Sequence, residues 1–522
     1  MRENSEKKVL RIACVQMRAM DGNRSEAVLE KALCLIDDAS KGGADLVLLP
    51  EAFYPSYYLG GIGTGWSWKG ALRDLSRKAE ERKIYLAAGL ILEDGEHLRN
   101  AAVLWGPDGE ECMRTYKSNL WHFDGRYVVP GKSFDVAETP WGTIGMMICA
   151  DGRIPEISRI LALKGARLIL DPTNLVASGR DPSRLSSPQI DYMLPARAAE
   201  NGVWIAVANK VGIEAESVLG CGGSCVIDPF GEKAASAGSL DEEILFAAVN
   251  LGVVPAARPV RTPEKYGAIV KRTEDTEAFR NLSLPLSPVE DEHFFGAAQF
   301  SFSSFPEFLE IAGRFLARST DQGGSFLCLP GPVRCGERYD PAAALAPALA
   351  QGGCVAACAL CDGDRKAERA VFFDRSGMIS SVEKGCFLPV DTPAGKFGVV
   401  FGDDGWNPEP IRCLMLEGAE TVLWFASLRD ERQRSVFEKI ARTRASENRI
   451  TIIASFEGSA RESYIVAPSG AVSAAALPGE PQAVFSLVRR SESRGKTVVP
   501  GTNIVTGRHP DLYSLLTDAS FS

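Results

Sequence analysis

The chain's 522 residues are more than one ordinary hydrophobic core accommodates, so two or more domains are expected. Hydrophobic residues make up 45% and charged residues 24% of the chain, as in water-soluble globular proteins, and no apolar run approaches the roughly 20 residues that span a bilayer. The net charge of -9, without a Lys/Arg stripe, lacks the electrostatic pattern of nucleic-acid binding. We therefore expect neither a nucleic-acid nor a membrane partner.

The cysteines and histidines limit which cellular location, metal site and catalytic base can be expected. The 13 cysteines are scattered, and Met1 to Lys8 is charged and lacks the apolar stretch of a secretory signal, so we expect a reducing, cytoplasmic location. Paired Cys/His spacing of a zinc site is absent, so no metal is expected. With only four histidines, none close to another, the base of an enzyme is expected to be a carboxylate.

The first half of the chain alternates apolar strands with amphipathic helices. Arg11 to Met17 is a β-rich run, and Asn23 with Glu26 three residues later predicts a capped helix start. The glycines at 42–43 predict the end of that helix. Leu46 to Leu49 is a continuous apolar strand, typical of a sheet covered on both faces. The pattern predicts an α/β fold.

A repeat relates the two halves. Thr139 to Glu156 resembles Thr392 to Glu409 at one constant offset and without gaps. Further ordered matches pair Arg197–Asn201 with Arg444–Asn448, Arg261–Tyr266 with Arg508–Tyr513, and Gln16 with Gln299. Prolines and a charge run break the pattern at 281–292. We predict a catalytic domain at 1–280, a linker at 281–292 and a second copy of the domain at 293–522.

Cys149 is a candidate nucleophile. It closes the apolar strand Met146 to Ile148, and Pro155 predicts a helix start shortly after it. Helix N–H groups and a nearby cation are expected to lower the pKa of a thiol on such a turn and to favour the thiolate. Taken alone, the position also fits an ordinary buried core cysteine.

Glu51 and Lys117 are candidates for the same site. Glu51 follows Leu48 to Pro50, where a buried strand ends, and a partly desolvated carboxylate can act as a base near neutral pH. The alternative for Glu51 is a cap for the next turn. Lys117, taken alone, is an ordinary surface lysine.

Three motifs together carry a family resemblance. LLPE (Leu48 to Glu51), YKSNL (Tyr116 to Leu120) and ICADGRIPE (Ile148 to Glu156) resemble, in order and spacing, the signatures of the nitrilase superfamily of carbon–nitrogen hydrolases. The resemblance covers residues 9–270, and its flanks include ARAAENG (Ala196 to Gly202) and GGSCVIDPFG (Gly222 to Gly231).

The resemblance implies an αββα sandwich with a Glu-Lys-Cys site. Cys149 would be the nucleophile, Glu51 the general base, and Lys117, with the backbone N–H after Cys149, the stabiliser of the tetrahedral intermediate. A thioester would form with loss of ammonia or an amine, and water activated by Glu51 would release the acid. This trio needs neither a metal nor an organic cofactor.

Supporting residues are expected at Asp124, Asp151 and Arg153. Many family members carry a second glutamate after the lysine motif, and here its position falls on Asp124 or on Gly125, depending on the alignment. Arg153 fits two roles: binding a substrate carboxylate, which favours N-carbamoyl amino acids or ω-amides, or a structural ion pair.

Substrate contacts are expected from Tyr57, Trp121 and Asn174. The loop Phe53 to Trp68 is rich in Tyr, Trp and Gly, which fits an aromatic wall of the pocket, a packed surface loop or an oligomer contact. A second candidate pocket loop is Ser178 to Gln189. Substrate size is not encoded in these loops.

The second copy has lost the signature chemistry. Gly331 stands where the first copy has Glu51, and Gly402 stands where it has Cys149. We therefore predict a catalytically dead domain. Since superfamily members pair back to back, the resemblance predicts an internal pseudo-dimer (αββα-αββα) whose dead half shapes the pocket. Further homo-oligomerisation is left open.

The expected activity is hydrolysis of a carboxamide or N-carbamoyl substrate. Cys149-Ala150-Asp151 follows the amidase and carbamoylase pattern, whereas true nitrilases usually have Cys-Trp-Glu. Two alternatives remain: a non-catalytic or weakly active ligand-binding protein, and an acyltransferase in which an amine intercepts the thioester.

Overall fold

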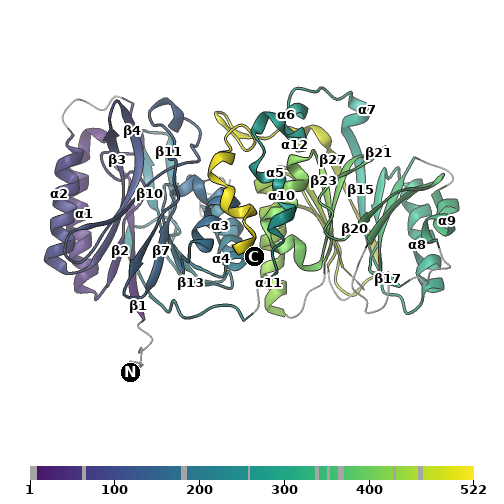
Figure 1. The fold of residues 1–522 in the computed structure, drawn as a ribbon, viewed down its shortest axis with the longest axis horizontal. Coiled ribbons are helices and arrows are strands. Elements are labelled where there is room, and N and C mark those ends of the chain that lie inside the picture. Colours follow the sequence, from purple (N-terminus) through teal and green to yellow (C-terminus); the bar gives the residue numbers. More distant parts are fainter. Residues whose placement is uncertain are drawn as a thin grey trace. The chain divides into compact units, whose positions relative to one another are not determined.

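The chain forms two compact units in the computed structural model (Figure 1). The structure describes residues 9–60, 66–177, 185–256, 259–334, 340–349, 353–361, 369–426, 431–456 and 462–521, without the side chains of 431 and 432. Unit 1 comprises Met1–Arg258 and Val499–Thr502, and unit 2 comprises Pro259–Val498 and Asn503–Ser522. The domain limits at 280 and 293 stay a prediction. Within the described ranges, no helix is both long and apolar enough to cross a membrane.

The larger sheet of unit 1 joins strands from distant parts of the sequence. Its order is β11 (Val218–Cys221), β10 (Lys210–Glu214), β1 (Leu10–Arg18), β2 (Leu46–Leu48), β3 (Tyr85–Asp94), β4 (His97–Trp105) and β5 (Glu111–Tyr116), and β14 (Glu243–Val249) also pairs with β1. β2 and β3 are parallel, whereas β4 is antiparallel to both β3 and β5. The C-terminal ends of β2 and β5 therefore share one edge of the sheet.

The smaller sheet completes the sandwich. Its order is β13 (Lys233–Ser236), β12 (Cys225–Ile227), β9 (Trp204–Ala208), β8 (Leu168–Pro172), β7 (Gly142–Met146) and β6 (Val136–Thr139). Helices α1 (Ser25–Lys41) and α2 (Trp68–Arg82) cover the larger sheet, and α3 (Pro155–Leu163) and α4 (Leu194–Asn201) cover the smaller one (Figure 1). The four layers confirm the predicted αββα sandwich.

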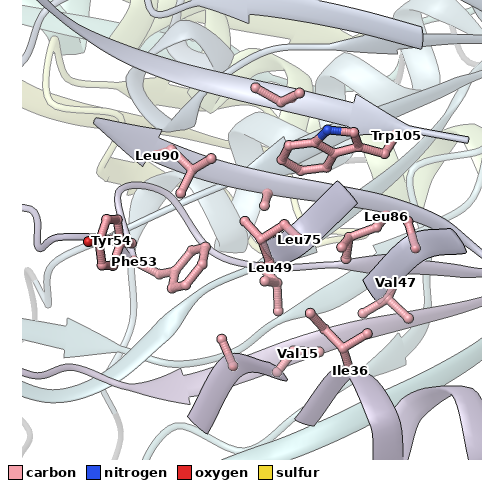
Figure 2. Packing of buried hydrophobic residues seen from close by; sticks show 14 of the residues in the cluster. Val15, Ile36, Val47, Leu49, Phe53, Tyr54, Leu75, Leu86, Leu90 and Trp105 are labelled. Carbon is pink, nitrogen blue, oxygen red and sulfur yellow. The ribbon is translucent and has the colours of Figure 1, made fainter. Parts of the chain in front are cut away.

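The core between the larger sheet and its two helices fixes this half of the sandwich (Figure 2). Ile36 of α1 and Leu75 of α2 are fully buried against strand residues such as Val15, Val47 and Leu86. Burying a side chain of this size stabilises the fold by about 1.5–3 kcal/mol. The buried residues of α1 recur every three or four positions, which is the period of one helix face.

The start of α1 differs from the prediction. Asn23 lies in a 3-10 turn, η1 (Gly22–Arg24), and the N-cap of α1 is Arg24 without a side-chain capping bond. The preceding 3-10 turn moves the helix start to Ser25, so the predicted capping box does not form. The predicted end is confirmed, because Gly42 is the C-cap and Gly43 has a φ of 85°.

Unit 2 repeats the strand order of the smaller sheet of unit 1 and, in its other sheet, the order of β5, β4, β3, β2, β1 and β14. One sheet runs β20 (Gly377–Glu383), β19 (Arg369–Asp374), β18 (Val355–Cys361), β16 (Phe326–Cys328), β15 (Glu292–Gln299) and β27 (Gln482–Arg489), with β17 (Val333–Arg334) beside β18. The other runs β21 (Val390–Thr392), β22 (Gly395–Phe401), β23 (Thr421–Ala426), β24 (Thr451–Phe456), β25 (Tyr464–Val466) and β26 (Val472–Ala475). Helices α8 (Phe305–Asp321) and α9 (Pro341–Leu345) lie on the first sheet, and α10 (Pro408–Leu416) and α11 (Glu431–Asn448) on the second (Figure 1).

Short elements complete the chain. The helical ones are α5 (Gly267–Val270), α6 (Glu277–Asn281), α7 (Pro288–Asp291) and α12 (Arg490–Arg494), and the strands β28 (Thr497–Val499) and β29 (Thr502–Asn503) pair with each other.

Residues shared by the two halves make the same buried contacts. Arg197 in unit 1 and Arg444 in unit 2 each pair with the glutamate three residues later, at 2.9 and 3.0 Å. The Nε of each arginine donates to a turn carbonyl, that of Gly152 or Gly405, at 3.1 Å. Arg197 therefore holds the turn that follows β7, and Arg444 holds the turn that follows β22, although only the first turn carries a cysteine.

Candidate functional site

Glu51 lies on the turn that follows β2, and its side chain is fully buried. Its backbone packs so closely on β3 that a Cβ at Gly89 would lie 2.5 Å from the Glu51 Cα, so only glycine fits there. Oε1 of Glu51 accepts hydrogen bonds from Asn100 Nδ2 and Lys117 Nζ, both at 2.7 Å. Among the described residues Oε2 has no partner. One oxygen is thus fixed and the other is available.

Lys117 directly follows β5, at the sheet edge where β2 ends. Its Nζ lies 2.7 Å from Glu51 Oε1 and 2.8 Å from Asp124 Oδ2. Burial alone would lower the pKa of Lys117, but the Asp124 and Glu51 carboxylates outweigh it and hold this pKa well above its usual value. The two carboxylates therefore favour the charged form of this fully buried ammonium.

Asp124, and not Gly125, contacts the lysine. Asp124 begins the 3-10 turn η2 (Asp124–Arg126) and is 4% exposed, and its Oδ2 also accepts the Trp121 N–H at 2.9 Å. Gly125 is exposed, and a Cβ built on it would meet only Leu120, at 3.9 Å. The shorter carboxylate reaches Lys117 because the turn brings its backbone close.

Cys149 opens the 3-10 turn η3 (Cys149–Arg153) between β7 and α3, with Pro155 in the first turn of α3 as predicted. Its φ is 51°, a left-handed conformation that is uncommon for residues with a side chain. Two buried contacts hold it there. Its N–H donates to Asp171 Oδ1 and its carbonyl accepts from Gln189 Nε2, both at 2.7 Å.

The prediction that the Cys149 thiol has a lowered pKa is wrong. Burial raises this pKa well above its usual value and the Glu51 carboxylate adds to the rise, while Lys117 and the Asn174 backbone N–H oppose it. Desolvation of the sulfur outweighs the cation and the N–H group. The resting thiol is therefore neutral, and its proton has to be accepted during attack.

Asp151 connects the segment of Lys117 to the turn of Cys149. Its Oδ1 accepts the N–H groups of Ser118 at 3.1 Å and Asn119 at 2.7 Å, and its Oδ2 accepts that of Ile148 at 3.0 Å. Burial raises the pKa of Asp151 to about 7, against the lowering effect of these N–H groups. Asp151 thus positions the lysine and the cysteine relative to each other.

The predicted substrate-contact residues fall in two places. The Tyr57 ring is buried, with its centroid 5.8 Å from Lys117 Nζ. Asn174 is 5% exposed, directs its N–H at the thiol, and its Nδ2 has no partner within the described parts of the chain. Trp121 lies further along, where the Arg153 guanidinium carbon sits 4.8 Å from the ring centroid. In the two predicted pocket loops, residues 61–65 and 178–184 lie outside the described residues.

Sequence reasoning missed Asn100, Asp171 and Gln189. Asp171 follows the apolar run Leu168 to Leu170, the same signal that pointed to Glu51, and was thus detectable. Asn100 is a buried polar residue inside β4, and its pairing with Glu51 depends on strand register. Within the described residues, no group of three His, Cys, Asp or Glu side chains is placed to hold a metal ion.

The turn of unit 2 that corresponds to the Cys149 turn keeps a similar backbone conformation but has no nucleophile. Gly402 has a φ of 49°, close to that of Cys149. At the repeat offset, Trp424 replaces Asp171, and its indole Nε1 donates to the Gly402 carbonyl at 2.9 Å. A Cβ at Gly405 would lie 2.2 Å from this indole. The Trp424 ring packs on Phe437, with the ring centroids 4.4 Å apart, and Phe437 also contacts Trp406, Phe456 and Tyr464.

Unit 2 has a glycine, Gly331, where unit 1 has Glu51. A Cβ on Gly331 would lie 2.9 Å from both the Cβ and the carbonyl oxygen of Ala359 in β18. In unit 1 the facing residue of β3 is Gly89, which leaves room for the Glu51 backbone. The space that a side chain needs at this position is therefore closed in unit 2.

Comparison with known proteins places the chain in a family. Residues 11–259 match the sequence profile described as Carbon-nitrogen hydrolase. Omega-amidase NIT2 of Danio rerio is 32% identical over 240 residues, 43% of this chain and 82% of that protein. A nitrilase of Pyrococcus abyssi is 30% identical over 262 residues, 47% of this chain and 92% of that protein. A solved amidase from Nesterenkonia sp. is 30% identical, covers 46% of this chain and 90% of its own, and has a TM-score of 0.42. The chain therefore belongs to the carbon–nitrogen hydrolase family, within the nitrilase superfamily that its three motifs resemble.

Proposed function

We propose that unit 1 hydrolyses a carboxamide or N-carbamoyl substrate through a thioester on Cys149. The observation that carries the proposal is a pair of buried polar atoms, Glu51 Oε2 and Asn174 Nδ2, that lack partners among the described residues. One is an acceptor and the other a donor, which is the complement of the N–H and C=O of an amide. Both belong to residues that act on the thiol: the Glu51 carboxylate raises its pKa, and the backbone N–H of Asn174 donates a hydrogen bond to it.

The first step begins with a neutral thiol. As the Cys149 sulfur attacks the carbonyl carbon, Glu51 accepts the thiol proton on its free Oε2. Negative charge then develops on the former carbonyl oxygen. The Lys117 ammonium and the backbone N–H of Ala150 stabilise it in a site from which bulk water is excluded. Glu51 returns the proton to the substrate nitrogen, the C–N bond breaks, and ammonia or an amine leaves.

The second step releases the acid. Glu51 takes a proton from a water molecule, the resulting hydroxide attacks the thioester carbon, and the C–S bond breaks. The thiol recovers its proton from Glu51. Asp124 keeps Lys117 charged and oriented through both steps, and Asp151 holds the lysine segment against the cysteine turn.

Arg153 suggests the class of substrate. Its guanidinium lies over the Trp121 ring, on the chain segment just before Asp124. A cation there suits a substrate that carries a carboxylate, such as an ω-amide or an N-carbamoyl amino acid. The relatives named omega-amidases agree with this assignment.

Unit 2 is proposed to be a catalytically dead copy that arose by tandem duplication. Its smaller sheet and six strands of its other sheet follow the order found in unit 1, and Gly331 and Gly402 stand where unit 1 has Glu51 and Cys149. The aromatic filling around Trp424 supports the same conclusion. One active centre per chain follows from this.

Ammonia release from a panel of amides and N-carbamoyl compounds tests the proposal. Wild type is expected to release ammonia and Cys149→Ala to release none above background, with Cys112→Ala, which alters an exposed cysteine, as the matched control. Intact mass spectrometry should find the acyl group on wild type only. Equal release by wild type and Cys149→Ala would eliminate the mechanism.

Arg153→Gln tests the substrate class separately. KM for ω-amides that carry a carboxylate is expected to rise at least about tenfold, and KM for neutral amides to stay within about twofold. A uniform change for both sets would assign Arg153 a structural role. Product analysis with added hydroxylamine separates hydrolysis from acyl transfer, because a transferase would give mainly the hydroxamate.

A further inference from the structure

A short segment near the C-terminal end of the chain belongs to unit 1. Val499–Thr502 groups with Met1–Arg258, although some 240 residues separate them in sequence. Thr502 opens β29, and its side chain is buried. This placement brings a residue from the degenerate half of the sequence into the unit that carries the candidate site.

Thr502 binds the loop that carries Asp124. Its Oγ1 accepts the His122 N–H at 2.8 Å and donates to the Leu120 carbonyl at 3.3 Å. His122 has a φ of 50°, a conformation that a residue with a side chain rarely adopts without support. Gly501 packs against the same residue, since a Cβ on it would lie 2.4 Å from the His122 carbonyl oxygen.

The contacts continue from this loop to the site. Trp121, between the two residues that Thr502 binds, donates its N–H to Asp124 Oδ2 at 2.9 Å. The same oxygen lies 2.8 Å from Lys117 Nζ. The Asp124 N–H returns to the Trp121 carbonyl at 2.9 Å, which closes the turn. The backbone at 120–122 thus sets the position of the Asp124 carboxylate.

We propose that Thr502 is a positioning residue of the amide-hydrolysing site: its hydroxyl fixes the backbone of residues 120–122 and thereby holds Asp124 on Lys117. This rests on the proposed function. It also gives a residue far along the chain a role at this site, because the Thr502 hydroxyl bonds the backbone of both Leu120 and His122. A displacement of about 1 Å at a reacting group can reduce a rate about a hundredfold, so a fixed loop has catalytic value.

The proposal predicts a specific pH effect. Lys117 interacts with the titratable groups of Asp124, Glu51, Cys149, Tyr57, Asp151 and Asp171. The Asp124 and Glu51 carboxylates contribute most to raising the pKa of Lys117 against the opposing effect of burial. If Asp124 moves away, the pKa of Lys117 falls, and the basic limb of the rate profile shifts to lower pH. General loss of folded protein would lower the rate without moving that limb.

The test compares Thr502→Val with Thr502→Ser in the full-length protein. Valine keeps the shape and removes both hydrogen bonds, whereas serine keeps the hydroxyl. We expect kcat/KM for the best amide to fall about tenfold in Thr502→Val, with the basic limb at lower pH, and to stay within about twofold of wild type in Thr502→Ser. Thr517→Val is the matched control, because the Thr517 hydroxyl donates to the nearby Ser514 carbonyl at 3.0 Å, in an exposed hydrogen bond.

A second readout does not depend on activity. Hydrogen exchange of the His122 amide should be faster in Thr502→Val and in Gly501→Ala than in wild type, and unchanged in Thr517→Val. Unchanged exchange and rate in Thr502→Val would overturn the proposal. So would an equal loss of rate in the valine and serine variants with no shift of the basic limb. If wild type releases no ammonia from any amide, the proposed function fails, and the exchange data still decide whether Thr502 holds the loop.

Discussion

Lys117 Nζ and Glu51 Oε1 are 2.7 Å apart, and both groups are fully buried. The lysine shares that oxygen with the Asn100 amide, so two donors fix one side of the carboxylate and leave Oε2 without a partner among the described residues. Because a buried ion pair with a free acceptor oxygen is costly to form, its presence argues for use in chemistry. The pair divides two tasks: Glu51 accepts protons and Lys117 stabilises negative charge.

Glu51→Gln is expected to affect turnover and thiol reactivity in opposite directions. Ammonia release should fall at least about a hundredfold, because the proton acceptor is lost. Alkylation of Cys149 by iodoacetamide at pH 7.5 should become faster, because the carboxylate that helps to raise the thiol pKa is gone. Intact mass spectrometry measures the alkylation rate, and Glu96→Gln, at an exposed position, is the control.

The wild-type thiol adds a check on this prediction. Since burial holds the pKa of Cys149 well above its usual value, the alkylation rate should keep rising through pH 9 without a plateau. A plateau near neutral pH would mean a preformed thiolate and would remove the need for Glu51 in the first step.

Asp124→Asn is expected to lower kcat/KM by about ten- to a hundredfold. The substitution removes one of the two carboxylates that raise the pKa of Lys117, so the basic limb of the pH–rate profile should move to lower pH. Asp135→Asn is a suitable control because it alters a half-exposed Asp–Lys pair, with Lys164 at 3.6 Å. An unchanged basic limb would show that Asp124 does not act on Lys117.

Asp171→Asn is expected to stabilise the protein at neutral pH. Burial, aided by the Asp151 and Glu51 charges, raises the pKa of Asp171 well above its usual value, while the Cys149 N–H and Lys117 oppose the rise. With the folded-state pKa raised, the stability contribution of Asp171 is complete below the unfolded pKa, near 4, and is lost as pH rises towards the folded pKa. Asparagine keeps an acceptor for the Cys149 N–H. Because its side chain does not ionise, it loses no stability as the pH rises.

The gain in the free energy of unfolding from Asp171→Asn should therefore grow with pH. We expect about 1 kcal/mol or more at pH 7.5 and little at pH 4, from melting curves at both values. Asp391→Asn, at an exposed position, should show no trend. An advantage that is constant across pH would contradict the buried neutral carboxyl.

Gly405→Ala tests how tightly the aromatic cluster of unit 2 is packed. The new Cβ would lie 2.2 Å from the Trp424 indole, so a loss of about 2–3 kcal/mol of stability is expected. Trp424→Leu alone should cost about 3 kcal/mol or more by leaving a cavity. The double variant should lose less than the sum, because the alanine no longer meets an indole. Additive losses would show that the two residues are not in contact.

Individual residues show how far local sequence reasoning reaches. Glu51 and Asp171 both follow apolar runs of the sequence, but only Glu51 was singled out as a buried carboxylate. The role of Asn100 is different, because its pairing with Glu51 across 49 positions depends on the register of β3 and β4. The pKa of Cys149 was predicted with the wrong sign, because sequence shows the nearby cation but not the depth of burial.

The sequence by itself indicated an α/β pattern through its local apolar periodicity, and the resemblance of its three motifs to the nitrilase superfamily implied the family, the αββα layers and the candidate trio. Only the tertiary structure decided that Asp124 contacts Lys117, that the thiol is neutral, and that Thr502 reaches the Asp124 loop. These depend on distances between groups that the chain brings together from far apart, and on the exclusion of water around them. Hydrogen bonds and desolvation energies are set by such distances, and no local pattern of residues encodes them.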